Sequence, residues 1–373
     1  MAPDELRAWL RLLQTPLIGR GAARRLLAAL GSPQGVFDAS PDALRALVGV
    51  KPASALSSPP SELDTLLATT LAWLNAEDAL AVRHVITLGD AQYPTSLLET
   101  ADPPLMLYAQ GDISLLQRLR TTLAVVGSRN PTPQGLETAR LFSEHASRAG
   151  LTIVSGLALG IDGAAHEGAL NGAATGQAVT IAVVGTGLDR VYPSRHLKLA
   201  HRIAAQGLML SEYPLGTAPL PPNFPQRNRI IAGLARATLV VEAALPSGSL
   251  ITAKQAMEAG RDVLAIPGSI HSPLSRGCHM LIKQGAKLVD CAQDVLEEFG
   301  QAATPKFAEA VSDDSRPDHP LLDALGYYPV SLDALSARTG RPPADLSGAL
   351  LELELEGRVS RLPGQLFQRC ERA

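Results

Sequence analysis

The turn formed by Gly127, Ser128 and Arg129 carries side chains that are well suited to hold a phosphate group. A glycine lets the backbone turn sharply and come close to a ligand. The hydroxyl group of Ser128 can donate a hydrogen bond, and the planar guanidinium group of Arg129 matches phosphate oxygens. A helix expected over 134–149 would aim its N-terminus at the same space, which favours an anion. The turn therefore predicts phosphate binding, with an ordinary surface charge as the alternative for Arg129.

A second group of suitable side chains lies around the start of a helix expected over 226–236. It combines an aromatic ring with basic and amide groups: Phe224, Arg227, Asn228 and Arg229. An aromatic ring can stack on a base, an amide can read a base edge, and a guanidinium group can hold the phosphate. Together they indicate single-stranded nucleic acid, although one aromatic residue near arginines also arises by chance.

A third turn runs from Ser155 to Asp162, and Gly156 within it lets the backbone approach a ligand. The glycine spacing is not G-x-G-x-x-G, and no acidic residue ends a following strand, so a nicotinamide site is weakly supported. Asp162 is expected to cap the next helix, with His166 one turn further on the same face. Because no third ligand is evident, a hydrogen-bonded pair that fixes the turn is favoured over a metal or acid–base site.

The sequence lacks the usual signatures of turnover. It contains no G-x-S-x-G elbow, no Walker P-loop and no recognisable pair of carboxylates in an apolar pocket. Its 8 histidines do not cluster at a metal-ligand spacing. Several anion-binding turns without a nucleophile or a general base favour binding over catalysis. We therefore expect no catalytic residue, no metal and no cofactor.

Charge and cysteine usage limit the setting in which the protein works. The net charge is −3, which is unusual for a nucleic-acid-binding protein, so the positive charge must be local to a groove. The 3 cysteines form no paired motif and are expected to be reduced thiols. With no N-terminal signal pattern and no apolar run long enough to cross a bilayer, we expect a cytoplasmic protein without a membrane partner.

Short apolar runs alternate with helical stretches over residues 83–300. The expected strands are 105–109, 123–126, 152–154, 180–184, 208–210, 238–241, 263–266 and 287–289, and the expected helices are 134–149, 162–171, 195–206, 226–236, 249–260 and 276–285. Strands that are apolar throughout are buried on both faces. The pattern predicts an α/β, Rossmann-like domain with a doubly wound, mostly parallel sheet, whose ligand site lies at the carboxyl ends of the strands.

Smaller modules are expected on both sides of this domain. Residues 1–82 have the pattern of a helical helix-hairpin-helix or SAM-like domain, whose turn over 16–21 either offers N–H groups to a phosphate or serves only in packing. Residues 301–318 are polar and contain proline, as in a linker. Residues 319–373 have the pattern of a winged helix. Its recognition helix carries acidic residues that repel phosphates, which favours a protein-contact or structural role.

The motifs of the α/β domain follow one another in a characteristic order. Residues 126–129 are followed by 155–162, 185–193, 211–214, 224–234, 241–243, 247–253 and 266–268. This ordered set closely resembles the bacterial DNA-processing protein A family, DprA or Smf. The resemblance implies a non-enzymatic mediator of natural transformation, which binds and protects incoming single-stranded DNA and loads the RecA recombinase onto it. It also implies a homodimer formed through the Rossmann-like domain.

The resemblance further implies which residues contact DNA. The Gly-Ser-Arg turn would contact phosphates, and residues 224–229 would line a pocket for an unstacked base. After Pro193 the sequence departs from the family, so the basic contact there is expected at Arg195 or Lys198. A family Gly-x-Asn pattern is replaced over 277–279, which puts the role of that asparagine in doubt, while Lys283 stays a candidate. The expected DNA-binding residues are Gly127, Ser128, Arg129, Gly156, Arg195, Lys198, Phe224, Arg227, Asn228, Arg229, Lys254 and Lys283.

Two other functions stay open at this point. A nucleotide-processing hydrolase of the phosphoribohydrolase type has a related fold, with Glu242 as its catalytic carboxylate. Its P-G-G-x-G-T motif is represented only by Pro267, Gly268 and Ser269, which lack the second glycine. A regulator that binds duplex DNA through the winged helix is the other alternative.

Overall fold

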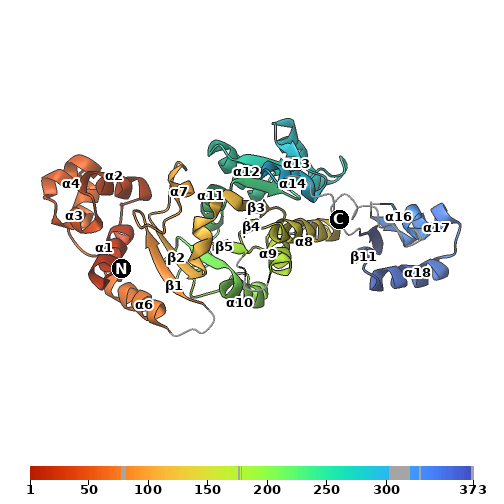
Figure 1. Cartoon of the computed structure of the whole chain (residues 1–373), viewed down its shortest axis with the longest axis horizontal. Helices are drawn as coiled ribbons and strands as arrows, with labels where there is room; N and C mark the ends of the chain where they lie inside the picture. Colours follow the sequence, from red (N-terminus) through yellow and green to blue (C-terminus); the bar gives the residue numbers. More distant parts are fainter. Residues whose placement is uncertain (77–80, 175–176, 178, 302–319, 327–328, 371–373) are drawn as a thin grey trace.

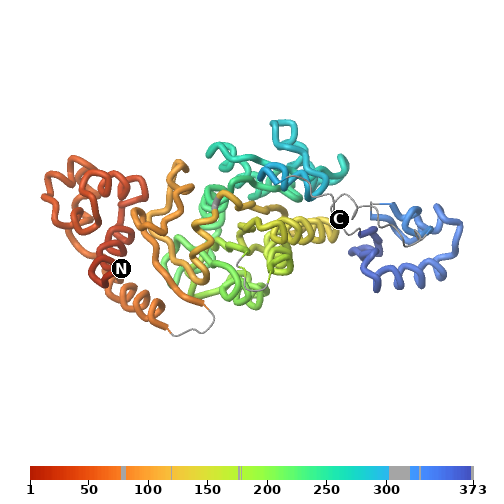
Figure 2. The backbone as a smooth tube through the Cα atoms, viewed as in Figure 1, coloured from red at the N-terminus to blue at the C-terminus, as the bar shows by residue number. Residues whose placement is uncertain are grey.

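The computed structural model describes residues 1–76, 81–174, 177, 179–301, 320–326 and 329–370. Three parts follow one another along the longest axis of the molecule: an N-terminal group of helices, a central sheet covered by helices, and a small C-terminal module (Figure 1; Figure 2). In the described part of the chain, no helix combines the length and the apolar character needed to span a bilayer.

The central domain is built on a nine-stranded sheet with the order β1-β2-β6-β5-β4-β3-β7-β8-β9. The strands are β1 (Arg83–Thr87), β2 (Met106–Gly111), β3 (Thr122–Val126), β4 (Thr152–Ser155), β5 (Thr180–Val184), β6 (Leu208–Ser211), β7 (Ala237–Val240), β8 (Asp262–Ala265) and β9 (Lys287–Leu288). In this spatial order, every pair of neighbouring strands from β6 through to β9 is parallel. Strands β1 and β2 add an antiparallel edge beside β6. The predicted doubly wound, mostly parallel sheet is confirmed.

Helices cover both faces because neighbouring residues of each strand point to opposite sides. On one face, Ala124 and Val126 of β3 share an apolar cluster with residues of α11 (Asn223–Leu234), α12 (Gly248–Glu258) and α13 (Arg276–Lys283). On the other face, Leu123 and Val125 contribute to a cluster with α8 (Pro133–Arg148), α9 (Ile161–Gly172) and α14 (Ala292–Glu298). Helix α10 (Leu197–Gln206) buries Ile203 in a cluster with Leu157 and Met209.

The N-terminal helices share their apolar core with the antiparallel edge of the sheet. They are α1 (Pro3–Gln14), α2 (Arg20–Leu30), α3 (Pro33–Asp38), α4 (Pro41–Val48), α5 (Val50–Leu56) and α6 (Leu63–Asn75), followed by the short α7 (Thr95–Leu98). Leu10 and Leu26 lie in one cluster with Tyr108 of β2, and the ring of Tyr108 meets that of Trp73 with centroids 5.8 Å apart. The apolar core therefore crosses the boundary predicted near residue 82.

The C-terminal module has the predicted winged-helix arrangement. It consists of α16 (Pro320–Leu325), β10 (Val330–Ser331), α17 (Leu332–Thr339), α18 (Pro343–Leu355), β11 (Val359–Leu362) and β12 (Leu366–Arg369). Its strands form a sheet of order β10-β12-β11, and Leu335, Leu350 and Phe367 meet in its core. Of the predicted linker 301–318, all but Gln301 lies outside the described residues.

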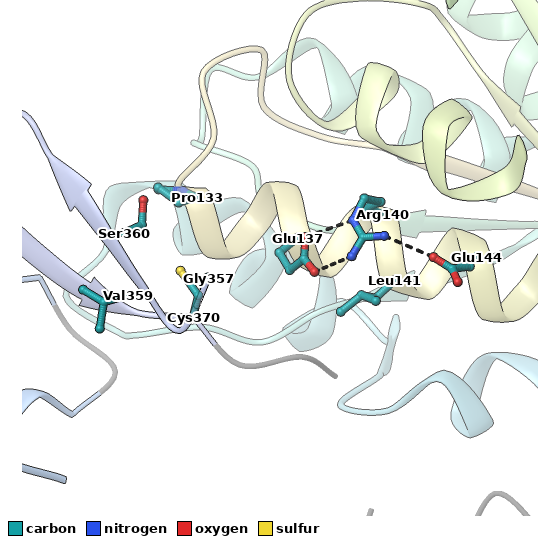
Figure 3. Close-up of a pocket in the computed structure, with 9 residues that line it drawn as sticks. All are labelled: Pro133, Glu137, Arg140, Leu141, Glu144, Gly357, Val359, Ser360 and Cys370. Carbon is teal, nitrogen blue, oxygen red and sulfur yellow. Dashed lines mark hydrogen bonds and ion pairs between the residues drawn. The ribbon is translucent and has the colours of Figure 1, made fainter. Parts of the chain in front are cut away.

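A cavity of about 710 Å³ lies between α8 and this module (Figure 3). Glu137, Arg140 and Glu144 line it from α8, while Gly357, Val359, Ser360 and Cys370 line it from the winged helix. Arg140 donates to the carboxylates of both glutamates, so these charges on the α8 wall are paired with one another.

Candidate functional site

The Gly-Ser-Arg turn lies at the carboxyl end of β3, between the turns that follow β4 and β7. A side chain at Gly127 would place its Cβ 2.7 Å from the Ile161 side chain, so only glycine fits this approach. The backbone N–H of Ile161 donates to the carbonyl oxygen of Ser128 over 3.1 Å. The N–H of Asn130 donates to Ser128 Oγ, also over 3.1 Å. The turn is thus held against the start of α9, with Arg129 left exposed.

Glu242 fixes the segment that follows this turn. Its carboxylate accepts a hydrogen bond from the N–H of Thr132 over 2.9 Å and another from the Thr132 hydroxyl group over 2.6 Å. The same threonine caps α8 by accepting from the N–H of Gly135. Burial raises the pKa of Glu242. This carboxylate therefore holds the α8 N-terminus beside the turn, which does not favour the catalytic role it would have in a hydrolase.

Arg129 lies beside a pair of aromatic rings contributed by two other elements. Its guanidinium carbon is 5.3 Å from the centroid of the Phe224 ring. The rings of Phe224 and Tyr192 have centroids 5.6 Å apart and an interplanar angle of 40°. Phe224 belongs to the first turn of α11, and Tyr192, which is 47% exposed, follows β5. Tyr192 was not among the expected contact residues, although the Tyr-Pro pair after the β5 turn marked its position.

Arg227 is buried behind these rings, with only 3% of its surface exposed. Its Nη1 donates to the carbonyl oxygen of Gly156 over 2.5 Å and also to that of Val183. Burial lowers the pKa of Arg227 to about 10. The side chain links the carboxyl ends of β4 and β5 from inside the domain. Gly156 serves the same link, because a Cβ there would lie 2.5 Å from the guanidinium group.

The neighbouring polar residues of α11 are also engaged within the protein. Arg229 pairs with Glu212 at 2.5 Å, and the side chains of both residues are 11% exposed. Asn228 Nδ2 donates to the carbonyl oxygen of Gly248 over 3.3 Å, while Asn228 Oδ1 accepts from Arg227 Nε over 3.2 Å. These contacts hold α11 in place and engage Arg229 inside the protein, whereas Arg129 is exposed.

The remaining basic candidates are spread around the domain. Arg195 and Lys198 are exposed near the start of α10, on the carboxyl side of β5. Lys254 is exposed in α12 and lies 3.7 Å from Glu258. Lys283 ends α13, the helix that leads from the carboxyl end of β8 to the amino end of the parallel strand β9. Lys283 therefore lies toward the amino ends of the parallel strands, away from the carboxyl edge that carries Phe224 and Tyr192.

Asp162 and His166 do not form the expected pair. The Asp162 carboxylate accepts from the N–H groups of Gly156 and Ala158 over 3.2 and 3.3 Å. His166 Nδ1 instead lies 2.8 Å from Thr180 Oγ1. Burial lowers the pKa of His166 to about 3, so its ring is neutral at physiological pH. Asp162 therefore fixes the turn after β4, whereas His166 links α9 to β5. Within the described residues, the candidate metal-ligand cluster is the separate group Asp290, Cys291 and Asp294.

Fold and site together define a three-part protein whose centre is Rossmann-like. A Rossmann-like domain presents an exposed arginine and two aromatic rings at the carboxyl edge of its sheet, between a helical module and a winged helix. The sequence profile of the DNA recombination-mediator protein A family matches residues 84–300, and that of the DprA winged helix domain matches residues 303–365. The chain belongs to the DprA/Smf family.

Relatives and solved structures agree with this assignment. Protein Smf of Escherichia coli K12 is 43% identical over 307 residues, which cover 79% of either chain. The DNA processing protein DprA of Streptococcus pneumoniae R6 is 50% identical over 210 residues, covering 56% of this chain and 72% of the relative. The X-ray structure of DprA from Streptococcus pneumoniae matches with a TM-score of 0.66 and 37% identity, covering 81% of this chain and 99% of that one.

A second solved structure is DNA processing protein A from Helicobacter pylori, described for its single-stranded DNA binding mode. It matches with a TM-score of 0.51 and 31% identity, and it covers 58% of this chain and 95% of that one.

Proposed function

We propose that this protein binds single-stranded DNA at the carboxyl edge of its central sheet and performs no chemistry on the strand. The observation that carries the proposal is the cluster of Arg129, Phe224 and Tyr192, in which Arg129 and Tyr192 are exposed and Phe224 is half-buried. The guanidinium group binds a backbone phosphate, and the rings stack on an unpaired base. Bases in a duplex already stack on one another, so a site of this kind selects single strands.

The distribution of charge supports this site. The chain has a net charge of −3, so an attractive potential for DNA must be local. Arg227 and Arg229 are engaged inside the domain, whereas Arg129, Arg195 and Lys198 are exposed on the carboxyl side of the sheet. The exposed residues supply the local charge, and the N-terminus of α8 adds its partial positive charge beside the Gly-Ser-Arg turn.

Binding of a labelled oligothymidylate and of a matched duplex, measured by fluorescence anisotropy over a series of salt concentrations, tests the proposal. The wild-type chain is expected to prefer the single strand. Arg129→Ala is expected to weaken binding and to reduce the slope of log K against log salt by about 0.7, the contribution of one phosphate of a single strand. Arg148→Ala, which removes an exposed arginine at the other end of α8, is the matched control. Unchanged binding by Arg129→Ala would refute the assignment of the site.

The proposal extends to the role that family membership suggests. The protein acts in the cytoplasm as a homodimer formed through its Rossmann-like domain, protects incoming single strands and loads RecA during natural transformation. The names of the DNA-processing relatives and the DNA-binding description of the Helicobacter pylori protein support this role. Sedimentation tests the dimer, nuclease challenge of bound oligonucleotide tests protection, and the rate at which RecA assembles on a coated strand tests loading.

A further inference from the structure

The N-terminal helical domain contacts the DNA-binding edge through a group of five charged residues. Arg20 and Arg24 of α2 pair with Asp102 at 2.7 and 2.5 Å. Arg229 of α11 lies 3.3 Å from the same carboxylate and 2.5 Å from Glu212. Arg20 also lies 3.4 Å from Glu212. Because Arg229 and Glu212 are each only 11% exposed, water screens this group less than it screens the ion pairs of the open surface.

Apolar contacts join the same two parts of the molecule. Leu215 is buried in the core cluster of the N-terminal helices, together with Leu10 and Leu26. Leu188 packs against this cluster. Leu188 belongs to the segment between β5 and Tyr192, and Leu215 belongs to the segment between β6 and α11. The N-terminal domain therefore supports both segments that lead to the aromatic rings.

Arg20 reaches the ring-bearing helix directly as well. Its Nη1 donates to the side-chain oxygen of Gln226 over 3.4 Å, and Gln226 is two residues beyond Phe224 in α11. Arg20 belongs to the 16–21 segment, whose turn was expected either to offer N–H groups to a phosphate or to serve only in packing. In the structure its guanidinium group is directed to Asp102, Glu212 and Gln226.

We propose that Arg20 and Arg24 are positioning residues for DNA binding, which rests on the function proposed above. They hold α11 and the Glu212 segment in the arrangement that keeps Phe224 against Tyr192 and Arg129. They contact no phosphate themselves. Affinity for single strands then depends on the N-terminal domain, although that domain contributes no side chain to the ring cluster.

The test compares Arg20→Ala/Arg24→Ala with the wild type in the full chain. Arg45→Ala, which breaks an exposed ion pair with Asp42 in the same domain, is the matched control. The probes are a labelled oligothymidylate and the same strand carrying 2-aminopurine, whose fluorescence reports stacking. The double variant is expected to bind about fivefold or more weakly, as for a typical coupling between sites, and to quench 2-aminopurine less at saturation. Its salt slope is expected to match that of the wild type, and Arg45→Ala to behave as the wild type throughout.

Three results would overturn the proposal. Unchanged affinity and quenching would show that the ion pairs only stabilise the fold. A salt slope reduced by about 0.7 or more would make Arg20 or Arg24 a phosphate contact. Full binding by Arg20→Gln/Arg24→Gln would show that the positive charges are not what positions α11. If circular dichroism shows the double alanine variant to be unfolded, Arg24→Ala alone is measured against the same criteria. A wild type that binds no single strand would instead refute the proposed function itself.

Discussion

Gly156→Ala probes the buried link between β4 and β5. The added Cβ would lie 2.5 Å from the guanidinium group of Arg227, which must move and release the carbonyl oxygens of Gly156 and Val183. A hydrogen bond to a charged group contributes about 1.5–3 kcal/mol, so losing both costs about 3 kcal/mol or more. In an Arg227→Met background no guanidinium group is present, and the same substitution is expected to cost less than about 1 kcal/mol.

Urea unfolding at 25 °C, followed by circular dichroism, gives the free energy of unfolding for all four members of this double-mutant cycle. The expected coupling between the two positions is about 2 kcal/mol or more. Gly248→Ala is the control, because a Cβ there meets nothing within 4 Å. If the two substitutions are instead additive within about 0.5 kcal/mol, the guanidinium group does not occupy the space beside Gly156 and the reasoning is refuted.

The remaining predictions concern pH, stacking and the winged helix. The pKa of His166 falls from 6.5 to about 3 on folding. Between these two values, the imidazole ring is protonated in the unfolded chain but neutral in the folded chain. Stability is therefore lost as pH falls below 6.5, by about 2 kcal/mol at pH 5. Urea unfolding of His166→Gln should lack this loss, and an equal loss in both chains would contradict the argument. Tyr192→Ala should weaken oligothymidylate binding about fivefold or more, as measured by fluorescence anisotropy. Leu197→Ala, which removes another exposed side chain, should bind as the wild type does. Deleting residues 310–373 should leave single-strand binding intact, whereas loss of all DNA binding would favour the winged helix as the DNA reader.

The central sheet could be predicted because its strands carry their burial in their own sequence. Runs such as 123–126 and 181–184 are apolar at every position, and β3 and β5 are buried along their whole length. The antiparallel edge strand β1 was missed. Only its last two residues are buried, so Arg83–Thr87 lacks the continuous apolar run that marked the others. An edge strand is stabilised by pairing with a neighbouring strand, and the hydrophobic pattern of its own residues does not show that pairing.

The candidate site could be predicted only as a set of residue types. The sequence has arginines close to Phe224, but whether they are exposed depends on which side of α11 packs against the sheet. That orientation buries Arg227 and leaves Phe224 half-buried beside the exposed Arg129. It also places the Phe224 ring against Tyr192, which lies in a different segment of the chain. The Asp162 and His166 pair was wrong for a similar reason, because the partner of His166 is Thr180 on β5.

The sequence by itself indicated the strands of the parallel sheet with the turns between them, the glycines that permit close approach, and Arg129 as a candidate for anion binding. These properties are local, since they depend on the chemistry of a few adjacent residues. Only the tertiary structure decided which arginines face solvent and which link strand ends. It also decided that Arg20 pairs with carboxylates of the central domain. A guanidinium group pairs with whatever acceptor the fold brings within reach, and that proximity arises from packing between segments distant in the chain.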